Sequence, residues 1–213
     1  MTMKNYQTPT AETYEGLDKA FNHFNKELFD NRLPSVLFTL TRKRKANGYF
    51  WADQFKHRED GDTTHEIALN PETMSRELVE VLSTLVHEMT HLEQEEYGKP
   101  GKKGHHNREW VGLMERIGLI PSNTGAPGGK QTGRQMTHYI DPMGDFLTSA
   151  NALIETGFDL PYFTQRGETT AAKKKDLSKV KRECPCCNAK AWAKQGMRII
   201  FGDCEELMIE EEV

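Results

Sequence analysis

The sequence of 213 residues lacks any long apolar run, and no stretch approaches the roughly 20 residues that a membrane-spanning helix needs. Its first residues, Met1 to Gln7, are polar and do not resemble the apolar segment of a secretory signal. Only 36% of the residues are hydrophobic, which still suffices for one core and a small additional module. We therefore expect a cytoplasmic protein with no membrane partner.

Cysteine is also scarce, and all four cysteines lie between Cys184 and Cys204. A secreted domain held by disulfides spreads its cysteines over the chain, whereas a short cluster is typical of a metal-binding knuckle in a reducing compartment. The cysteine pattern therefore agrees with a cytoplasmic location.

Histidine, in contrast, occurs in an informative pattern at residues 87–91, which read His-Glu-Met-Thr-His. Two histidines four positions apart on a helix, His87 and His91, point to the same side and can bind one zinc ion. Glu88 between them can then act as general base on a water molecule at the metal, which attacks a carbonyl group. The pattern is short enough to arise by chance, so its context decides.

The context predicts a helix around this pattern. Asn70 and Pro71 form a helix-start signal, and Gly98 with Pro100 forms a stop signal. Between them, apolar residues recur at the three- and four-residue spacing of an amphipathic helix: Met74, Leu78, Val81, Leu82, Leu85, Met89 and Leu92. The alternative is that both histidines are ordinary surface residues of a stable helix.

A hydrolytic zinc site needs a third protein ligand and one open position. The segment after Lys102 has the apolar spacing of a further helix, with Trp110 on its inward face. His106 lies four residues before Trp110 and is therefore the predicted third ligand, with Glu109 as the alternative. His105 falls on the opposite side, where we expect it to be solvated.

These residues resemble the SprT-like zinc metalloproteases, a group that includes Spartan, the DNA-dependent protease of DNA–protein crosslink repair. The resemblance covers most of residues 12–140 and again 180–208. It is carried by blocks in the family's order: 24–34, His65 to Pro71, His87 to His91, Gly104 to Trp110, Cys184 to Cys187, Ala191-Trp192 and Gly202 to Cys204. It implies that His87, His91 and His106 bind the catalytic zinc, and that a zinc ribbon follows.

The ribbon departs from the family pattern. Cys184 and Cys187 form one thiolate pair, but Cys204 lacks its partner because residue 201 is Phe. Cys186 or Asp203 could complete the site. The module could also hold together without metal through apolar residues, Trp192, Ile199, Ile200 and Phe201. A second, structural zinc ion is therefore an open possibility.

The fold class that we expect is α+β. The spacing of apolar residues predicts helices over 12–30 and 145–156, in addition to the two zinc-bearing helices, and strands over 36–41, 48–55 and 65–69. A small sheet would pack with the helices, and its edge strand would lie beside the cleft. The expected division is a protease domain over 1–166, a basic linker over 167–182 and a ribbon-like module with an acidic tail over 183–213.

Residues 121–135 are rich in Gly, Pro, Ser and Thr and predict a long loop without regular structure. At its end, His138 or Tyr139 could donate a hydrogen bond to the oxyanion if the loop folds over the metal. The alternative is a short strand with one exposed histidine.

Basic residues are segregated in a chain of net charge −4. One cluster, residues 42–45, adjoins the first strand, and another precedes the cysteines: Lys173, Lys174, Lys175, Lys179, Lys181 and Arg182. Together with Trp192 as a stacking surface, these residues could bind single-stranded or damaged DNA. A charge run is also found on ordinary solvated faces, which is the alternative.

The sequence therefore predicts a zinc-dependent endopeptidase that cleaves proteins bound or crosslinked to DNA, associated with the nucleoid when DNA is bound. Two other classes stay open. A non-catalytic nucleic-acid-binding or transcription-associated factor could keep zinc as a structural part, but such a site would not need Glu88. A zinc hydrolase of small peptides or amides would need a closed pocket rather than a groove.

Overall fold

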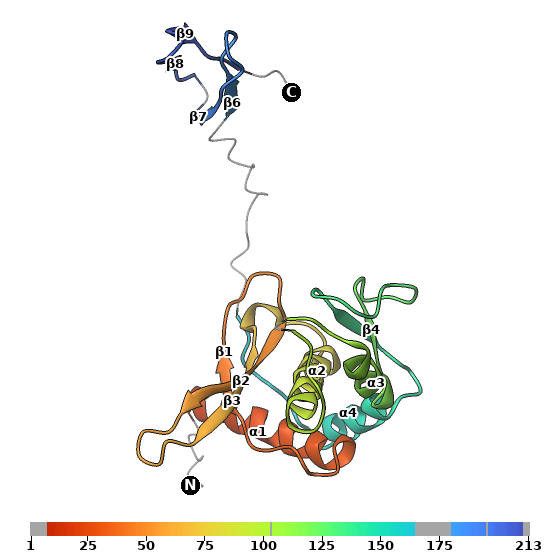
Figure 1. The fold of residues 1–213 in the computed structure, drawn as a ribbon. Coiled ribbons are helices and arrows are strands. Elements are labelled where there is room, and N and C mark those ends of the chain that lie inside the picture. The colour runs from red at the N-terminus through yellow and green to blue at the C-terminus, as the bar shows by residue number, and fades with distance from the viewer. Residues whose placement is uncertain (1–7, 103, 165–179, 195, 211–213) are drawn as a thin grey trace. The chain divides into compact units, whose positions relative to one another are not determined.

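The structure is a computed structural model that describes residues 8–102, 104–164, 180–194 and 196–210. The chain divides into two compact units, Met1–Gln165 (unit 1) and Arg166–Val213 (unit 2). Within the described ranges it contains four α-helices and small β-sheets (Figure 1). The predicted α+β class is confirmed.

Helix α1, Pro9–Leu28, begins where two start signals coincide. The Thr8 side chain accepts a hydrogen bond from the Ala11 backbone N–H at 3.2 Å, and Pro9 occupies the first helical position. The helix ends just before Asp30 and Asn31, which adopt left-handed backbone angles of 53° and 55° in φ. Its apolar face is buried, as the spacing in the sequence predicts.

The larger sheet in the described part of unit 1 has three strands, β1 (Leu37–Leu40), β2 (Gly48–Lys56) and β3 (Thr63–Leu69), and a smaller sheet pairs β4 (Leu119–Ser122) with β5 (Thr137–Ile140). Their order is β1-β3-β2, with β1 parallel and β2 antiparallel to β3. β2 is therefore an edge strand. Its pairing is irregular between Trp51 and Phe55, where Asp53 has a φ of 47°; the Asp53 N–H donates to His65 Nδ1 at 3.1 Å. This bulge interrupts the edge.

Helix α2, Leu78–Tyr97, carries the histidine pattern, but it starts later than predicted. Asn70 and Pro71 instead open a single 3-10 turn, Pro71–Thr73, in which Asn70 Oδ1 accepts from the Glu72 N–H at 3.1 Å. The Asn70 amide also donates to the carbonyls of Lys43 and Ala46. The asparagine therefore holds the β1–β2 connection rather than capping α2. The predicted stop at Gly98 is confirmed.

The second predicted zinc-bearing helix, α3, spans Arg108–Arg116 and is also shorter than expected. Asn107 is its cap, because Asn107 Oδ1 accepts from the Trp110 N–H at 3.0 Å. His106 therefore precedes the helix. Strand β4 (Leu119–Ser122), strand β5 (Thr137–Ile140) and helix α4 (Asp145–Glu155) follow. The predicted loop thus begins after Ser122 rather than at Pro121.

The core of unit 1 forms where α2 packs against β2 and β3, and where α1 and α4 pack against α2. Phe24 of α1 stacks on Phe146 of α4 at 5.7 Å between ring centroids. A buried carboxylate, Glu93 of α2, is paired with Arg32 and Arg116, so three segments meet at one ion cluster. This core holds the central part of α2 rigidly in place.

Unit 2 consists of short strands: β6 (Val180–Glu183), β7 (Lys190–Ala193), β8 (Ile200–Phe201), β9 (Glu206–Leu207) and β10 (Ile209–Glu210). One sheet has the order β10-β6-β7, and β8 pairs with β9. Its buried residues include Cys184, Ala193 and Met208. Among all the residues that the structure describes, no helix is both long and apolar enough to cross a membrane.

Candidate metal centre

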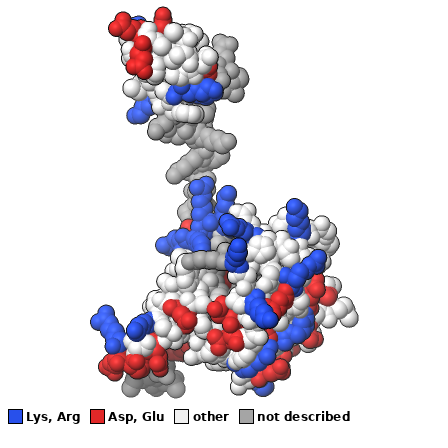
Figure 2. All heavy atoms as spheres, in the orientation of Figure 1, with Lys and Arg blue, Asp and Glu red and all other residues white. Residues whose placement is uncertain are grey.

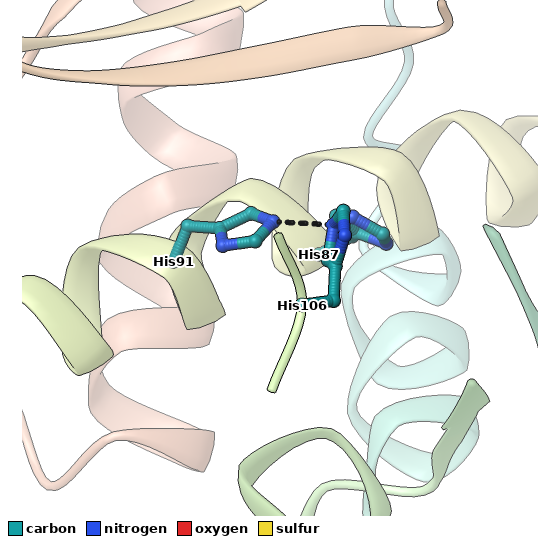
Figure 3. A group of neighbouring side chains, drawn as sticks. All are labelled: His87, His91 and His106. Carbon is teal, nitrogen blue, oxygen red and sulfur yellow. Dashed lines mark hydrogen bonds between the residues drawn. The ribbon is translucent and has the colours of Figure 1, made fainter. Parts of the chain in front are cut away.

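Three histidines from two segments converge in unit 1 (Figure 3). His87 and His91 project from the same side of α2, and one nitrogen of each ring, together with one of His106, lies within 4.8 Å of the others. The Nε2 atoms of His91 and His106 are 3.1 Å apart. The structure therefore brings together the three residues that the sequence indicates as ligands of one ion.

His106 reaches this position by a route that the sequence analysis did not predict. It forms an isolated β-bridge with Gly133, in which each backbone N–H donates to the other residue's carbonyl, at 2.8 and 3.1 Å. The same Gly133 carbonyl lies 3.0 Å from His106 Nδ1. A carbonyl can only accept, so Nδ1 carries the hydrogen and the Nε2 lone pair is free. A loop rather than a helix face therefore orients the third histidine.

Trp110 forms the floor behind all three rings. Its side chain is fully buried, and its ring centroid lies 5.0 Å from His87, 5.1 Å from His91 and 4.4 Å from His106. The indole stacks nearly parallel to the His91 ring, with 17° between the planes. This rigid aromatic platform limits the rotations that the imidazole rings can make.

Burial sets the protonation state of the histidines. It lowers the pKa of His87 well below its usual range, lowers that of His91 to about 3 and also lowers that of His106. All three imidazoles are therefore neutral near pH 7, which is the form that binds metals. Three neutral nitrogen donors at this separation fit a zinc ion with one coordination position left for another group.

Glu88 is buried beside this cluster, with 5% of its surface exposed. Burial raises the pKa of Glu88 to about 8, against the opposing effects of the Lys43 charge and a hydrogen bond from the Phe50 backbone. Gly48 leaves room for the carboxylate, because a Cβ atom at that position would lie 3.1 Å from Glu88 Oε1 and 2.9 Å from the Ala68 carbonyl oxygen. Strand β2 thus borders the glutamate directly.

A cleft of about 900 Å³ opens over the histidines and Glu88. One wall is β2, from Gly48 to Ala52, and another is formed by residues 134–138. Basic residues contribute to its lining: Lys43, Arg44, Lys45, Lys102 and Arg134. Figure 2 shows Lys and Arg side chains gathered over this end of unit 1. The site is therefore accessible along an edge strand and has a basic rim.

The model of the SprT-like family matches residues 17–128, more than half of the chain and the segment that holds all three histidines and Glu88. This chain belongs to the SprT-like family. It is also similar to a protein of Salmonella typhimurium described as an uncharacterized protein in the mucB 3' region, with 46% identity over 59 residues. That match covers 28% of this chain and 80% of the Salmonella protein. No solved structure shows significant similarity.

In this SprT-like chain Glu109 does not face the histidines, so the structure does not support it as an alternative ligand. Its carboxylate accepts hydrogen bonds from the Gln94 amide and the Lys99 backbone N–H, each at 2.7 Å. It thereby closes the C-terminal end of α2. His105 is exposed, as expected.

His138 and Tyr139 take different positions on β5. His138 contacts His87, with 3.0 Å between their Nδ1 atoms, and its Nε2 lies 2.9 Å from Ser83 Oγ. Tyr139 is half-buried and lines a smaller neighbouring cavity of about 270 Å³. An oxyanion role for either residue stays a prediction, and both ring nitrogens of His138 already have partners.

In unit 2 the sulfur atoms of Cys184, Cys187 and Cys204 lie within 4.8 Å of one another. Two turns carry these cysteines. Asn188 N–H donates to the Cys184 carbonyl in the first turn, and Cys204 N–H donates to the Phe201 carbonyl in the second. Phe201 thus lies three residues before Cys204, at the position where the ribbon pattern expects a cysteine.

The fourth cysteine of the SprT-like chain, Cys186, also contacts this cluster. Hydrogen bonds of the Cys204 thiol with Cys187 and then Cys186 are the main causes that raise the pKa of Cys204 to about 12. The backbone N–H of Cys187, and less strongly that of Cys186, lowers the pKa of Cys184. Three thiols converge here, with Cys186 within reach as a further donor, so the group is compatible with zinc.

The residues predicted to contact DNA are distributed unevenly. Lys173, Lys174, Lys175 and Lys179 lie outside the described residues. Lys181 is on β6, and Trp192 of β7 has 63% of its surface exposed. Arg182 is buried and paired with Glu210 at 3.2 Å, so its guanidinium stabilises unit 2 instead of facing solvent. The prediction of a DNA contact by Arg182 is not supported.

Sequence reasoning missed several residues of the site: Gly48, Ser83, Trp110 and Gly133. None of them has a reactive group in an informative spacing, and Trp110 was interpreted only as a core residue. Their contribution depends on contacts between segments distant in sequence. Gly133, for example, approaches His106 across 27 positions.

Proposed function

We propose that this SprT-like protein is a zinc-dependent endopeptidase. The observation that carries the proposal is the position of Glu88, whose buried carboxylate adjoins three neutral histidines at the base of a cleft. A zinc ion that only stabilises the fold needs no such carboxylate, and structural sites are closed by four protein ligands.

The residues divide the chemistry between them. His87, His91 and His106 would hold the zinc ion, which would supply a Lewis acid to polarise a peptide carbonyl and acidify water. Glu88 accepts the proton of the attacking water and passes it to the departing amine nitrogen. Burial raises the pKa of Glu88, which helps the carboxylate hold the accepted proton until it is passed on.

The edge strand supports a protein substrate rather than a small molecule. An extended peptide can add to β2 as a further antiparallel strand, which lays its backbone along the cleft. Phe50 of β2 already directs its backbone toward Glu88, so a peptide paired with this part of the strand passes the carboxylate. This arrangement favours cleavage within an unfolded segment.

We further propose that the protein substrates are bound or crosslinked to DNA. The basic rim of the cleft would place phosphates near the metal, and the exposed Trp192 offers a surface for stacking a base. Phosphate contacts carry no sequence information, so the protein would act on DNA-bound proteins at any sequence.

The test is cleavage of an unstructured protein, free and crosslinked to single-stranded DNA, by the purified full chain with and without a chelator. Glu88→Gln should keep zinc and lose at least about 100-fold in rate, because an amide cannot accept the proton. Glu96→Gln, on the same helix but outside the lining of the cleft, is the matched control. Full activity of Glu88→Gln would reject the proposal, and loss of zinc in that variant would assign Glu88 a structural role.

A further inference from the structure

A chain of hydrogen bonds leads from the backbone of α2 through β5 back to His87. Ser83 Oγ lies 2.9 Å from the Glu80 carbonyl oxygen and 2.9 Å from His138 Nε2. His138 Nδ1 lies 3.0 Å from His87 Nδ1. We name these contacts the Ser83–His138–His87 chain. It connects His138 of β5 to His87, the first histidine of the pattern at residues 87–91.

The direction of each bond follows from the first one. The Glu80 carbonyl can only accept, so the single Ser83 hydroxyl hydrogen is used there. Ser83 Oγ must then accept from His138 Nε2–H. A neutral His138 with its hydrogen on Nε2 has a lone pair on Nδ1, which accepts from His87 Nδ1–H. His87 is left with a lone pair on Nε2, the other side of its ring.

Hydrogen bonds that ran in the opposite direction along this chain would place the other tautomer on His87. If Ser83 donated to His138 Nε2, His138 would donate from Nδ1 to His87, and His87 Nε2 would carry a hydrogen and could not bind a metal. The Glu80 carbonyl therefore decides the tautomer of His87 across three hydrogen bonds. His106 is fixed in the equivalent way by a carbonyl, that of Gly133, at 3.0 Å from its Nδ1.

We propose that His138 is a positioning residue that holds His87 in the tautomer with a free Nε2 lone pair. The inference rests on the proposed metal centre but not on peptide cleavage. It also removes His138 from the candidates for oxyanion stabilisation, because neither ring nitrogen has a hydrogen to spare. Partners of this kind behind a metal-binding histidine typically change metal affinity by 10- to 100-fold.

The direct test is nitrogen NMR of the histidine rings in the isotope-labelled full chain, as purified and after addition of a chelator. We expect His87 to carry its hydrogen on Nδ1 in both samples and its metal, when present, on Nε2. A His87 ring with hydrogen on Nε2, or with metal on Nδ1, would overturn the proposal. This readout does not depend on any enzymatic activity.

Zinc affinity, measured by competition with a chromophoric chelator, gives the second test. His138→Phe keeps a planar ring but removes the acceptor, so affinity should fall by about 10- to 100-fold. His138→Asn places an oxygen near the former Nδ1 and should recover most of that loss. His23→Phe is the matched control, since His23 also contacts a serine, Ser149 at 3.0 Å, but lies away from the cleft. Its affinity should not change.

Different failures give different results. Wild-type zinc affinity in folded His138→Phe would overturn the positioning role, and a loss of kcat alone in both His138 variants would return His138 to the oxyanion role. If His138→Phe does not fold, Ser83→Ala tests the same chain, because it leaves His138 without its acceptor and should lower zinc affinity while adding the second tautomer of His87. An unchanged tautomer in Ser83→Ala would count against the proposal. Absence of proteolysis in the wild type would reject only the proposed protease function.

Discussion

Glu109 shows how one carboxylate can suggest a metal ligand in the sequence and have another task in the structure. It lies three residues after His106, but it accepts hydrogen bonds from the Gln94 side chain and the Lys99 backbone at the end of α2. A Cβ atom on Gly98 would lie 2.9 Å from this carboxylate. A side chain at residue 98 would therefore require this carboxylate to move, and it would also lie 3.0 Å from the Gln94 carbonyl oxygen.

Glu109 also gives a prediction for the pH dependence of stability. The hydrogen bond from Gln94, and then that from Lys99, lowers the pKa of Glu109, so the folded state favours the carboxylate. This contribution is present at neutral pH and is lost as the pH falls through the folded-state pKa, which lies below the usual value of a glutamate side chain. Glu109→Gln should therefore be less stable than the wild type at pH 7, by at most about 1 kcal/mol because the group is exposed, and the difference should vanish in acid.

Urea unfolding of both proteins at pH 7 and at a series of lower pH values measures this difference. Glu115→Gln, on the same helix, controls for the general effect of removing a charge. A difference between wild type and Glu109→Gln that grows as the pH falls would contradict the assignment.

At the scale of elements, the sequence predicted the existence of helices and strands better than their ends. The apolar spacing located α1, α2, α4 and the three strands of the larger sheet of unit 1, because it records which face meets the core; it did not locate β4. The ends failed where an asparagine served a different segment: Asn70 holds the β1–β2 connection, and Asn107 caps α3 one residue after His106. Spacing within one segment contains no information about such distant contacts.

The same reason explains the outcome for the metal centre. Residues 87–91 could be interpreted within one helix, whereas His106 was found through a helix register that does not exist. His106 lies near α2 because a loop residue, Gly133, pairs with its backbone. His106 was selected because it lies four residues before the buried Trp110. The selected residue does lie beside His87 and His91, although the helix assumed to carry it does not include it.

The Gly133 bridge allows a second prediction. Gly133 has a φ of 140°, which favours glycine, so Gly133→Ala should strain the loop by roughly 1–2 kcal/mol and misplace His106. Zinc affinity should fall by about tenfold. Gly128→Ala is the matched control, because Gly128 also has a positive φ, 84°, in the same loop but meets no other atoms. Chelator competition compares the two, and equal affinities would show that the bridge does not orient His106.

Unit 2 yields a third prediction through its incomplete cysteine set. Three thiols converge, and residue 201, where the ribbon pattern expects a cysteine, is Phe, so the full chain should contain between one and two zinc ions and lose the second one first to mild chelation. Phe201→Cys should raise the content towards two. Phe201→Ser, which removes the ring without adding a thiol, is the control. A wild-type content of two that Cys186→Ser lowers would instead assign the fourth ligand to Cys186.

At the scale of the whole molecule, unit 1 contains the continuous hydrophobic core, from Leu17 to Leu160, together with the histidine cluster. Deletion of residues 168–213 should therefore leave zinc and slow cleavage of an unstructured protein intact. The deletion also removes the lysine cluster and Trp192, so DNA affinity should weaken by about tenfold and lose part of its salt dependence.

Gel-shift titrations at two salt concentrations measure this effect, with proteolysis and zinc content as controls for folding. Unchanged DNA affinity would assign binding to the basic rim of unit 1, which Arg44→Ala and Lys45→Ala can test. Absence of binding by the full chain would favour a protease that does not act on DNA-bound substrates.

The bulge in β2 limits the length of edge with which another copy of the protein can pair. An exposed edge strand is a template for aggregation, since any extended chain can pair with it. Here the regular part of β2 runs from Gly48 to Trp51, and the bulge follows at Asp53, whose backbone N–H donates to His65 Nδ1. Only about four residues before the bulge are therefore in register for an added strand. A second copy of this protein could pair regularly with β2 over this short stretch only. The residues that remain available are those beside Glu88.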